Sequence, residues 1–417
     1  MYPLKAPGPD GMPPFFFQHF WPTVGNLVTK TVLDFLNFGI SPPKFNETHI
    51  VLVPKINKPK KVTEYRPISL CNVIYKLAAK TLANRLKKIL PSIISDTQSA
   101  FVNGRLITDN VLVAFETMHH ISQRRIGKKG EMTLKLDMSK AYDRVEWSCL
   151  NKIMEKLGFH PTWCSLMMQC ISSVTYSIRI IGKPTGHIIP SRGLHQGDPL
   201  SPYLFLLCAE GLSALIKKAV ADGHMESISL CRGGPLLSHL FFADDSIIFC
   251  KASIEDCDAL QRVLKVYEMA SRQQLNRAKT SLYFSSNTAR EVQEEIKARF
   301  GAQVIKQHEK YLGLPSLVGR NKKNTFKEIK EKLARKLAGW KEKRLSKAGK
   351  EILIKAVAQA IPTYSMSCFK ILDALCEEMT SLIRNFWWGQ KNEEWNMAWI
   401  SCEKLCLPKS QGGMGFK

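Results

Sequence analysis

The sequence lacks any long apolar run, internal repeat or low-complexity segment, although 45% of its 417 residues are hydrophobic. A membrane-spanning helix needs roughly 20 consecutive apolar residues, and no stretch approaches that length. The first residues, MYPLKAPGP, do not resemble a secretory signal peptide. We therefore expect an intracellular protein, nuclear or cytoplasmic, with two or three subdomains and no membrane partner.

The twelve cysteines lack the regular spacing of a disulfide framework. They are scattered from Cys71 to Cys406 in a chain too large to need disulfides, which is typical of reduced thiols in the cytosol or nucleus. Cys402 and Cys406 supply only the first half of a zinc pattern, so zinc binding is disfavoured there.

Acidic residues are scarce. The sequence has 36 Asp and Glu against 60 Lys and Arg, a net charge of +24. This balance suits a phosphate backbone or another anionic surface. Residues 320–350 alone hold thirteen Lys or Arg and three Glu. Any cluster of acids in such a chain is therefore informative.

Two adjacent aspartates interrupt an apolar run, LFFADDSIIFC at residues 240–250. Burying Asp244 and Asp245 would be costly unless a cation or a tight turn between two strands receives them. The pattern predicts a β-hairpin with a metal site at its tip. A solvated turn is the alternative.

A third carboxylate, Asp137, ends a second predicted strand, MTLKLD at residues 132–137. Alternation of apolar and polar residues indicates a half-buried strand. Together, Asp137, Asp244 and Asp245 would be oxygen ligands of the kind that Mg²⁺ prefers. Two such ions, roughly 3.5–4 Å apart, would activate a primer 3′-hydroxyl and stabilise the leaving pyrophosphate.

Three ordered segments around these acids resemble the motif series of reverse transcriptases, specifically the LINE-type, non-LTR retrotransposon branch found in plants. They are KLDMSKAYDRV at 135–145, RGLHQGDPLSP at 192–202 and FADD at 242–245. Supporting stretches are KAPGPDG at 5–11, YRPISL at 65–70, QSAFVNGR at 98–105, YLGLP at 311–315 and LSKAGK at 345–350. The resemblance implies an RNA-directed DNA polymerase with Mg²⁺, an RNA template, a DNA primer and dNTPs.

The same resemblance implies an α+β right-hand polymerase fold, with fingers, a palm of antiparallel sheet plus helices, and a helical thumb. We expect fingers at residues 1–130, a palm at 131–317 with an inserted fingers segment at about 145–195, and a thumb at 318–390. Residues 391–417 would begin a truncated C-terminal region. The endonuclease that the family carries upstream is not in this sequence, which predicts an excised or degenerate polymerase core.

Tyr142, five positions after Asp137, is the candidate steric gate by this resemblance. A flat ring beneath the incoming sugar leaves no room for a 2′-hydroxyl and would favour deoxynucleotides; an ordinary core aromatic is the alternative. Asp143 and Glu146 have the spacing of a capping box before an apolar helical pattern. We therefore favour a cap over a fourth metal ligand for Asp143.

In the QGDPLSP loop, Gly197 allows close backbone approach, and Pro199 favours a turn before the helical run 203–219. The resemblance assigns Gln196 and Gly197 to the templating base and the nucleotide sugar; a simple helix-entry turn is the alternative. It also makes Arg66 and Lys55 the cations that bind the triphosphate. The forked guanidinium of Arg matches a phosphate better than the Lys ammonium does. Solvated surface cations are the alternative there.

Lys279 lies in a segment, LNRAK, that resembles the one whose lysine protonates the leaving pyrophosphate, so Lys279 is a candidate general acid. Arg272 departs from the family pattern, which usually has glycine there. If that turn needs a positive φ, the Cβ costs about 1 kcal/mol.

The basic segment has one apolar face at helical spacing: Phe326, Ile329, Leu333, Leu337 and Trp340. Its other face is basic, and it resembles the thumb helix that clasps the duplex. We predict that Lys336, Lys341 and Lys343 contact the nucleic acid; a solvated basic face is the alternative, and a membrane surface is disfavoured. Ser346 is predicted to cap the next helix.

Two functions remain open on sequence alone. The intact carboxylates favour a polymerase, whereas Arg272 and both chain ends favour a catalytically decayed, nucleic-acid-binding remnant of the same element. A group II intron-like maturase would need a splicing-associated domain, for which no room remains after Lys417.

Overall fold

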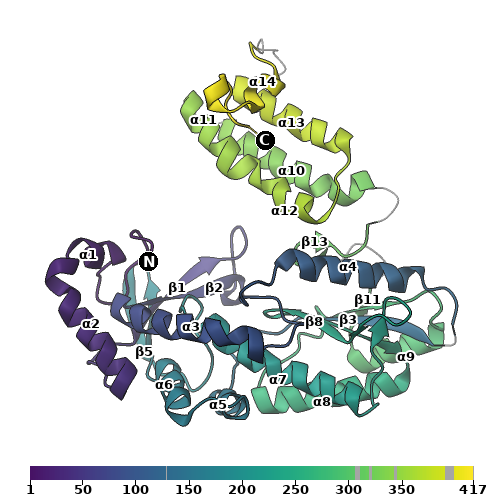
Figure 1. The fold of residues 1–417 in the computed structure, drawn as a ribbon, viewed down its shortest axis with the longest axis horizontal. Coiled ribbons are helices and arrows are strands. Elements are labelled where there is room, and N and C mark those ends of the chain that lie inside the picture. The colour runs from purple at the N-terminus through teal and green to yellow at the C-terminus, as the bar shows by residue number, and fades with distance from the viewer. Residues whose placement is uncertain (128, 306–309, 319–321, 342–344, 390–398, 417) are drawn as a thin grey trace. The chain divides into compact units, whose positions relative to one another are not determined.

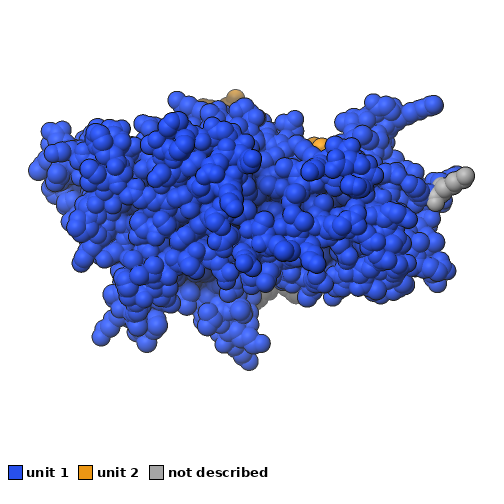
Figure 2. All heavy atoms as spheres, turned by 90° about the horizontal axis from the view of Figure 1, so that it is seen from below, with its two compact units in different colours: residues 1–110, 120–305 blue, residues 111–119, 306–417 orange. Residues whose placement is uncertain are grey.

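The computed structural model describes residues 1–127, 129–305, 310–318, 322–341, 345–389 and 399–416. The chain divides into two compact units (Figure 2). Unit 1 comprises residues 1–110 and 120–305, and unit 2 comprises residues 111–119 and 306–417. Unit 1 contains both of the larger β-sheets, whereas unit 2 is mainly helical.

The first sheet of unit 1 has four strands in the order β2-β1-β4-β5. Strand β1 pairs antiparallel with β2 and parallel with β4, so the sheet joins two distant stretches of sequence. Helices of the N-terminal part lie beside it (Figure 1). These elements are β1 (Glu47–Pro54), β2 (Tyr65–Cys71), β4 (Thr175–Ile180), β5 (Lys183–Ile188), α1 (Pro14–His19), α2 (Trp21–Phe38) and α3 (Val73–Ile93).

The second sheet has five strands in the order β11-β10-β3-β9-β8, with β3 in the middle. Helices α7 and α8 line one face of this sheet (Figure 1). The elements are β3 (Gly130–Leu136), β8 (His239–Phe242), β9 (Asp245–Ala252), β10 (Ser281–Phe284), β11 (Gln303–Val304), α7 (Ser201–Ala221) and α8 (Ile254–Ser271). Helix α7 includes the predicted run 203–219, so that prediction is confirmed.

Strand β3 is buried on both faces, so the prediction of a half-buried strand is wrong. Thr133 and Glu131, on the face expected to be polar, are as buried as Leu134. The reason is the central position of β3 in the sheet. The end of α4 (Ile107–Gln123) reaches the polar face, where His120 meets Glu131.

Asp143 does not cap a helix, which corrects the prediction. Helix α5 (Trp147–Lys156) has Glu146 at its N-cap position, without a side-chain capping bond. The backbone explains the late start, because Gly193 N donates to Val145 O at 2.8 Å and Glu146 N donates to Ser271 O at 3.1 Å. These bonds hold Val145 and Glu146 in place, with Glu146 extended, immediately before the helix.

The remaining described elements of unit 1 are short or peripheral. They are α6 (Pro161–Ser172), α9 (Arg290–Phe300), β6 (Ile228–Ser229), β7 (Leu236–Leu237) and a 3-10 helix (Val62–Glu64). Helix α5 packs against both α6 and α7.

Unit 2 buries the predicted apolar stripe of α10, since Phe326, Leu333 and Leu337 pack with Leu375 and Met379 of α13. The Ser346 cap is also confirmed: its Oγ accepts from Gly349 N at 3.2 Å. No helix among the described residues combines the length and apolar character needed to cross a membrane. The elements are β12 (Lys310–Tyr311), β13 (Leu314–Pro315), α10 (Lys322–Lys341), α11 (Lys347–Leu353), a π-helical turn (Ile354–Ala358), α12 (Ala360–Cys368), α13 (Asp373–Trp388), α14 (Cys402–Cys406) and a 3-10 helix (Lys409–Gln411).

Candidate active site

The predicted hairpin is confirmed, with Ala243 and Asp244 forming a two-residue turn between β8 and β9. Phe242 pairs with Asp245, and Ala243 takes a left-handed φ of 54°. Apolar side chains on both strands enter the core, while both aspartates reach solvent at the tip. The tight turn thus removes most of the cost of placing two acids inside an apolar run.

The five-stranded sheet brings Asp137 to the tip of this hairpin. Strand β3 pairs antiparallel with β9, and Leu136 lies opposite Ser246. One further step of this register sets Asp137 opposite Asp245, beside Asp244. Strand pairing therefore gathers three carboxylates that are far apart in the sequence at one end of the sheet.

These carboxylates repel one another. Partial burial raises the pKa of Asp245, and the charges of Asp244 and Asp137 raise it further against the opposing effect of Lys135. Burial also raises the pKa of Asp244, and Asp137 adds to the effect. Bringing the three carboxylates together therefore costs electrostatic free energy, which Lys135 partly offsets at Asp245.

The donor set suits a hard divalent cation, because all three groups are carboxylates. Among the residues that the structure describes, no three acidic, His or Cys side chains converge closely enough to hold a metal as they stand. Asp137, Asp244 and Asp245 would have to turn towards a shared ion.

Asp137 has two polar neighbours from the loop between α8 and β10. Asn276 Nδ2 donates to Asp137 Oδ2 at 3.0 Å, and Lys279 Nζ lies 4.0 Å from the same oxygen. The side chains of Asp137 and Lys279 are 42% and 70% exposed, so both can reach a ligand. Sequence reasoning missed Asn276, although it stands three residues before Lys279 in the segment that was singled out.

Gln98 is a second residue that sequence reasoning missed. It is 1% exposed, and its Oε1 accepts from Ala243 N at 3.1 Å and from Ala100 N at 3.0 Å. Asn110 Nδ2 donates to Phe241 O at 2.9 Å. These bonds hold the turn that carries Asp244. The QSAFVNGR stretch contains Gln98, but only the tertiary structure reveals its partner.

Arg272 ends α8 with φ of 57° and ψ of 9°, the left-handed conformation. The conditional prediction of a positive φ is therefore confirmed. A side chain at this position costs about 1 kcal/mol relative to glycine. The next residues nonetheless carry Asn276 and Lys279 to Asp137.

Tyr142 stacks on Phe205 of α7, with ring centroids 4.6 Å apart and planes inclined by 13°. Burial raises the pKa of the Tyr142 hydroxyl, and the nearby charge of Asp244 raises it further. The ring is thus held rigidly beside the carboxylates. This placement is compatible with both the gate and the core alternatives.

Gln196 and Gly197 are tied to the first sheet. Ser69 N of β2 donates to Gln196 O at 2.8 Å. Gly197 has φ of 109°, and a Cβ there would lie 2.9 Å from Ser69 O, so the position requires glycine. Buried Asp198 then accepts from Ser201 N at 2.9 Å, which orders the entry to α7.

Arg66 and Lys55 belong to the paired strands β1 and β2. Arg66 is exposed on β2, opposite Val53, and Lys55 directly follows β1. Lys55 Nζ donates to Thr63 O at 3.0 Å. Burial raises the pKa of Asp143, while the charges of Lys140 and Lys55 oppose the shift. The charge of Lys55 therefore acts on Asp143, in the segment that follows Asp137.

The predicted thumb lysines are only partly described. Lys336 is exposed on α10, Lys341 is the last residue of that helix, and Lys343 lies outside the described residues. Other lysines of the helix are already paired, since Lys323 and Lys330 lie 2.9 Å and 2.6 Å from the carboxylate oxygens of Glu378. Part of the positive charge of the helix is therefore neutralised within unit 2.

A family model described as reverse transcriptase (RNA-dependent DNA polymerase) matches residues 56–316. The chain is 28% identical over 422 residues to the transposon TX1 uncharacterized 149 kDa protein of Xenopus laevis, covering 99% of this chain and 30% of that protein. It is also 28% identical over 263 residues to a retrovirus-related Pol polyprotein from the type-1 retrotransposable element R2 of Popillia japonica, covering 61% of this chain and 33% of that protein. The chain thus spans about a third of the length of these relatives.

Solved structures give more distant likenesses. Telomerase from Candida tropicalis in complex with a fragment of telomeric RNA aligns with a TM-score of 0.46 at 12% identity, covering 87% of this chain and 57% of that chain. The Candida albicans counterpart aligns with a TM-score of 0.42 at 12% identity, covering 90% and 62%.

The family match covers more than half of the chain and includes Asp137, Asp244 and Asp245. The matched residues include the end of β3, the β8–β9 hairpin, the QGDPLSP loop and strand β2, which carries Arg66. The α+β right-hand polymerase fold predicted from the sequence is thereby confirmed. The chain belongs to the reverse transcriptase (RNA-dependent DNA polymerase) family.

Proposed function

We propose that this chain is the polymerase core of a non-LTR retrotransposon of the plant LINE type. It would extend a DNA primer with deoxynucleotides on an RNA template. The relatives of similar sequence include retrotransposon proteins, and an uncharacterized mitochondrial protein of Arabidopsis thaliana is 52% identical over 67 residues, covering 16% of this chain and 55% of that protein. The similarity to retrotransposon proteins supports the origin, and the plant match supports the branch.

One observation carries the activity: β3 and the β8–β9 hairpin bring Asp137, Asp244 and Asp245 to one end of the sheet, where the charges of Asp244 and Asp137 raise the pKa of Asp245. A cation from outside the protein would relieve this repulsion. These three carboxylates would hold Mg²⁺. When bound, the metal supplies activation of the primer hydroxyl and charge stabilisation at the transferred phosphate.

The other residues act on the substrate. Arg66, with Lys55, would bind the triphosphate, and Lys279 would protonate the departing pyrophosphate from its position beside Asp137. Tyr142 would exclude a ribose 2′-hydroxyl. Gln196 and Gly197 would contact the templating base and the nucleotide sugar.

The duplex would be bound by the basic helix of unit 2. Lys336, Lys341 and Lys343 are proposed to contact its phosphates. The fingers, palm and thumb are proposed at residues 1–130, 131–317 and 318–390, with a fingers segment inserted in the palm at about 145–195. Residues 391–417 are proposed to form a separate C-terminal region.

Primer extension tests the proposal. Purified protein is supplied with poly(rA)/oligo(dT), dTTP and Mg²⁺, and the primer length is followed. We expect extension that requires Mg²⁺ and that is lost in Asp244→Ala, while the affinity for the annealed duplex stays unchanged. Duplex binding without any Mg²⁺-dependent extension would identify a binding-only remnant and overturn the proposal.

A further inference from the structure

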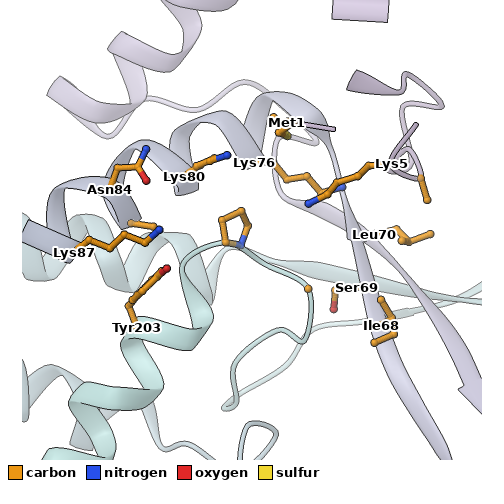
Figure 3. Close-up of a pocket in the computed structure, with 14 residues that line it drawn as sticks. Met1, Lys5, Ile68, Ser69, Leu70, Lys76, Lys80, Asn84, Lys87 and Tyr203 are labelled. Atoms are coloured by element: carbon orange, nitrogen blue, oxygen red, sulfur yellow. The ribbon is translucent and has the colours of Figure 1, made fainter. Parts of the chain in front are cut away.

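Two turns of unit 1 differ in how they accommodate a left-handed residue. At Gly197 the residue is glycine, with φ of 109°, and a Cβ there would lie 2.9 Å from Ser69 O. Both residues line a pocket of about 410 Å³, and Figure 3 shows Ser69 there, beside the loop that precedes α7. At Lys140, between Asp137 and Tyr142, φ is 51° although the residue is not glycine. Other contacts must therefore hold the turn at Lys140.

Two hydrogen bonds hold the chain on either side of Lys140. Ser139 N donates to Gln274 O at 2.8 Å, and Gln273 Nε2 donates to Ala141 O at 3.0 Å. Both partners come from the loop that follows α8. The left-handed conformation at Lys140 therefore persists because a distant segment of the chain holds the residues before and after it.

The bond from Gln273 is the one that uses a side chain. Gln273 is 1% exposed, whereas its neighbour Gln274 is exposed. An amide is costly to bury unless it is hydrogen-bonded, and the amide of Gln273 donates to the backbone carbonyl of Ala141. This buried glutamine is therefore tied to one point of the chain, directly before Tyr142.

That point decides where Tyr142 lies. The carbonyl of Ala141 belongs to the peptide group that also contains Tyr142 N, and a peptide group is planar, so fixing the carbonyl also fixes Tyr142 N. Tyr142 O accepts from Leu194 N at 2.8 Å, and the tyrosine ring stacks on Phe205. Tyr142 is thus held at both of its peptide groups and at its ring, and Gln273 supplies the first of these three contacts.

We infer that Gln273 is a positioning residue, which sets the discrimination between deoxynucleotides and ribonucleotides by fixing Tyr142. The inference rests on the proposed function, in which the ring of Tyr142 excludes a ribose 2′-hydroxyl. Gln273 would not touch the nucleotide, because its side chain is buried. Without its amide, the turn at Lys140 loses one of its two bonds, and the ring is no longer fixed where a 2′-hydroxyl would lie.

The first test compares single-nucleotide extension with dTTP and with UTP on poly(rA)/oligo(dT). Gln273→Met keeps the length of the side chain but removes its donor. We expect the preference for dTTP over UTP to fall by about three- to tenfold, because the ring remains but is less firmly placed. A parental preference in a folded Gln273→Met protein would overturn the inference.

Gln274→Met is the matched control. The side chain of Gln274 is exposed, and its bond to Ser139 uses the backbone oxygen, which the substitution keeps. We expect this variant to retain the parental preference for dTTP over UTP. An equal fall in both variants would mean that any change in this loop disturbs the sugar choice, and the role assigned to the Gln273 amide would be overturned.

A double-variant cycle tests whether Gln273 acts through Tyr142. In a Tyr142→Ala background, Gln273→Met should leave the preference unchanged, since no ring remains to be positioned. Independent effects that multiply would mean that Gln273 acts by another route and would overturn the inference. Gln273→Asn, whose amide is one methylene further from Ala141 O, replaces the methionine variant if thermal melting shows that the latter is unfolded.

Hydrogen exchange separates this inference from the proposed polymerase. In EDTA and without nucleotide, we expect the amides of residues 138–146 to exchange about tenfold faster in Gln273→Met than in the parent or in Gln274→Met, by mass spectrometry. Equal exchange in all three proteins would overturn the positioning role. A parent protein that never extends a primer defeats the proposed polymerase, and exchange then decides whether Gln273 holds the turn. A parent that extends, with a parental dTTP/UTP preference in Gln273→Met, defeats this inference alone.

Discussion

The two ends of β3 carry carboxylates in opposite surroundings. Glu131, near the start of the strand, has a side chain that is 1% exposed. Arg124 Nη1 lies 2.7 Å and Lys251 Nζ lies 2.9 Å from its Oε1, and His120 lies 3.4 Å from its Oε2. Here the protein provides its own counter-charge.

Asp137, directly after the strand, has a side chain that is 42% exposed, with only Lys279 at 4.0 Å as an ion-pair partner among the described residues. Its closest acidic neighbours, Asp244 and Asp245, add repulsion. The difference teaches how a structural acid is told from a functional one. The protein neutralises the first from within, and we propose that it leaves the second to an external cation.

The largest effect is expected at the end of β3 that Asp137 follows. Asp137→Asn keeps the size of the side chain but removes the charge that would hold the metal. We expect primer extension to fall by about 10³-fold, with duplex affinity unchanged by anisotropy. Extension within tenfold of the parent protein would show that Asp137 is not a metal ligand and that the comparison fails at this end.

Near the start of β3, the corresponding removal of the Glu131 charge should affect folding instead of extension. Glu131→Gln leaves Arg124 and Lys251 without their counter-charge, and we expect the free energy of unfolding to fall by about 2–4 kcal/mol in urea titrations, since both cations retain some solvent. Asp137→Asn is the control and should shift it by less than about 0.5 kcal/mol. Equal changes in the free energy of unfolding for Glu131→Gln and Asp137→Asn would remove the distinction between a structural and a functional acid.

Tyr142 should control the choice between deoxynucleotides and ribonucleotides. Tyr142→Ala should raise ribonucleotide incorporation relative to deoxynucleotide incorporation by about 10–100-fold, because a clash worth about 1–3 kcal/mol is relieved. The measurement is single-nucleotide extension with dTTP and UTP. A variant that stays folded by thermal melting and keeps the parental ratio would make Tyr142 a core aromatic stacked on Phe205.

The smallest effect should have the opposite sign from Glu131→Gln. Because the folded-state pKa of Asp245 is raised, the stability linked to this carboxyl is present below its unfolded pKa, about 3.9, and is lost as the pH rises through the folded value. Asp245→Asn should therefore raise the free energy of unfolding by a few tenths of a kcal/mol at pH 7–8 in EDTA.

That gain should disappear as the pH falls to about 4, and thermal melts across this range measure it. Mg²⁺ should reverse the order at neutral pH. At ten times its Kd the ion would stabilise the parent protein by about 1.4 kcal/mol and the variant by less. A variant that is less stable than its parent in EDTA would mean that the three acids do not repel one another.

Local patterns were sufficient for several parts of this molecule. The apolar run around Asp244 and Asp245 predicted a hairpin, because strand pairing and a two-residue turn are local events. The stripe of Phe326, Leu333 and Leu337 predicted the buried face of α10 for the same reason. The ordered motifs predicted the family, which the match over residues 56–316 establishes.

Other features were beyond sequence patterns. The alternation in residues 132–137 predicted one polar face, but the position of β3 in the middle of the sheet buried both faces. The spacing of Asp143 and Glu146 predicted a cap, but backbone bonds from Gly193 and to Ser271 delayed the helix to Trp147. In both cases a partner from a distant segment overrode a local preference.

The sequence by itself determined the residue types: three acids in a basic chain, each at the end of a strand. The tertiary structure alone decided which charges have partners. It gave Glu131 its cations and placed Asn276 and Gln98 around the aspartates. The physical reason is that electrostatic interactions depend on distance and burial, which are set by long-range pairing of strands and helices and not by neighbours in the chain.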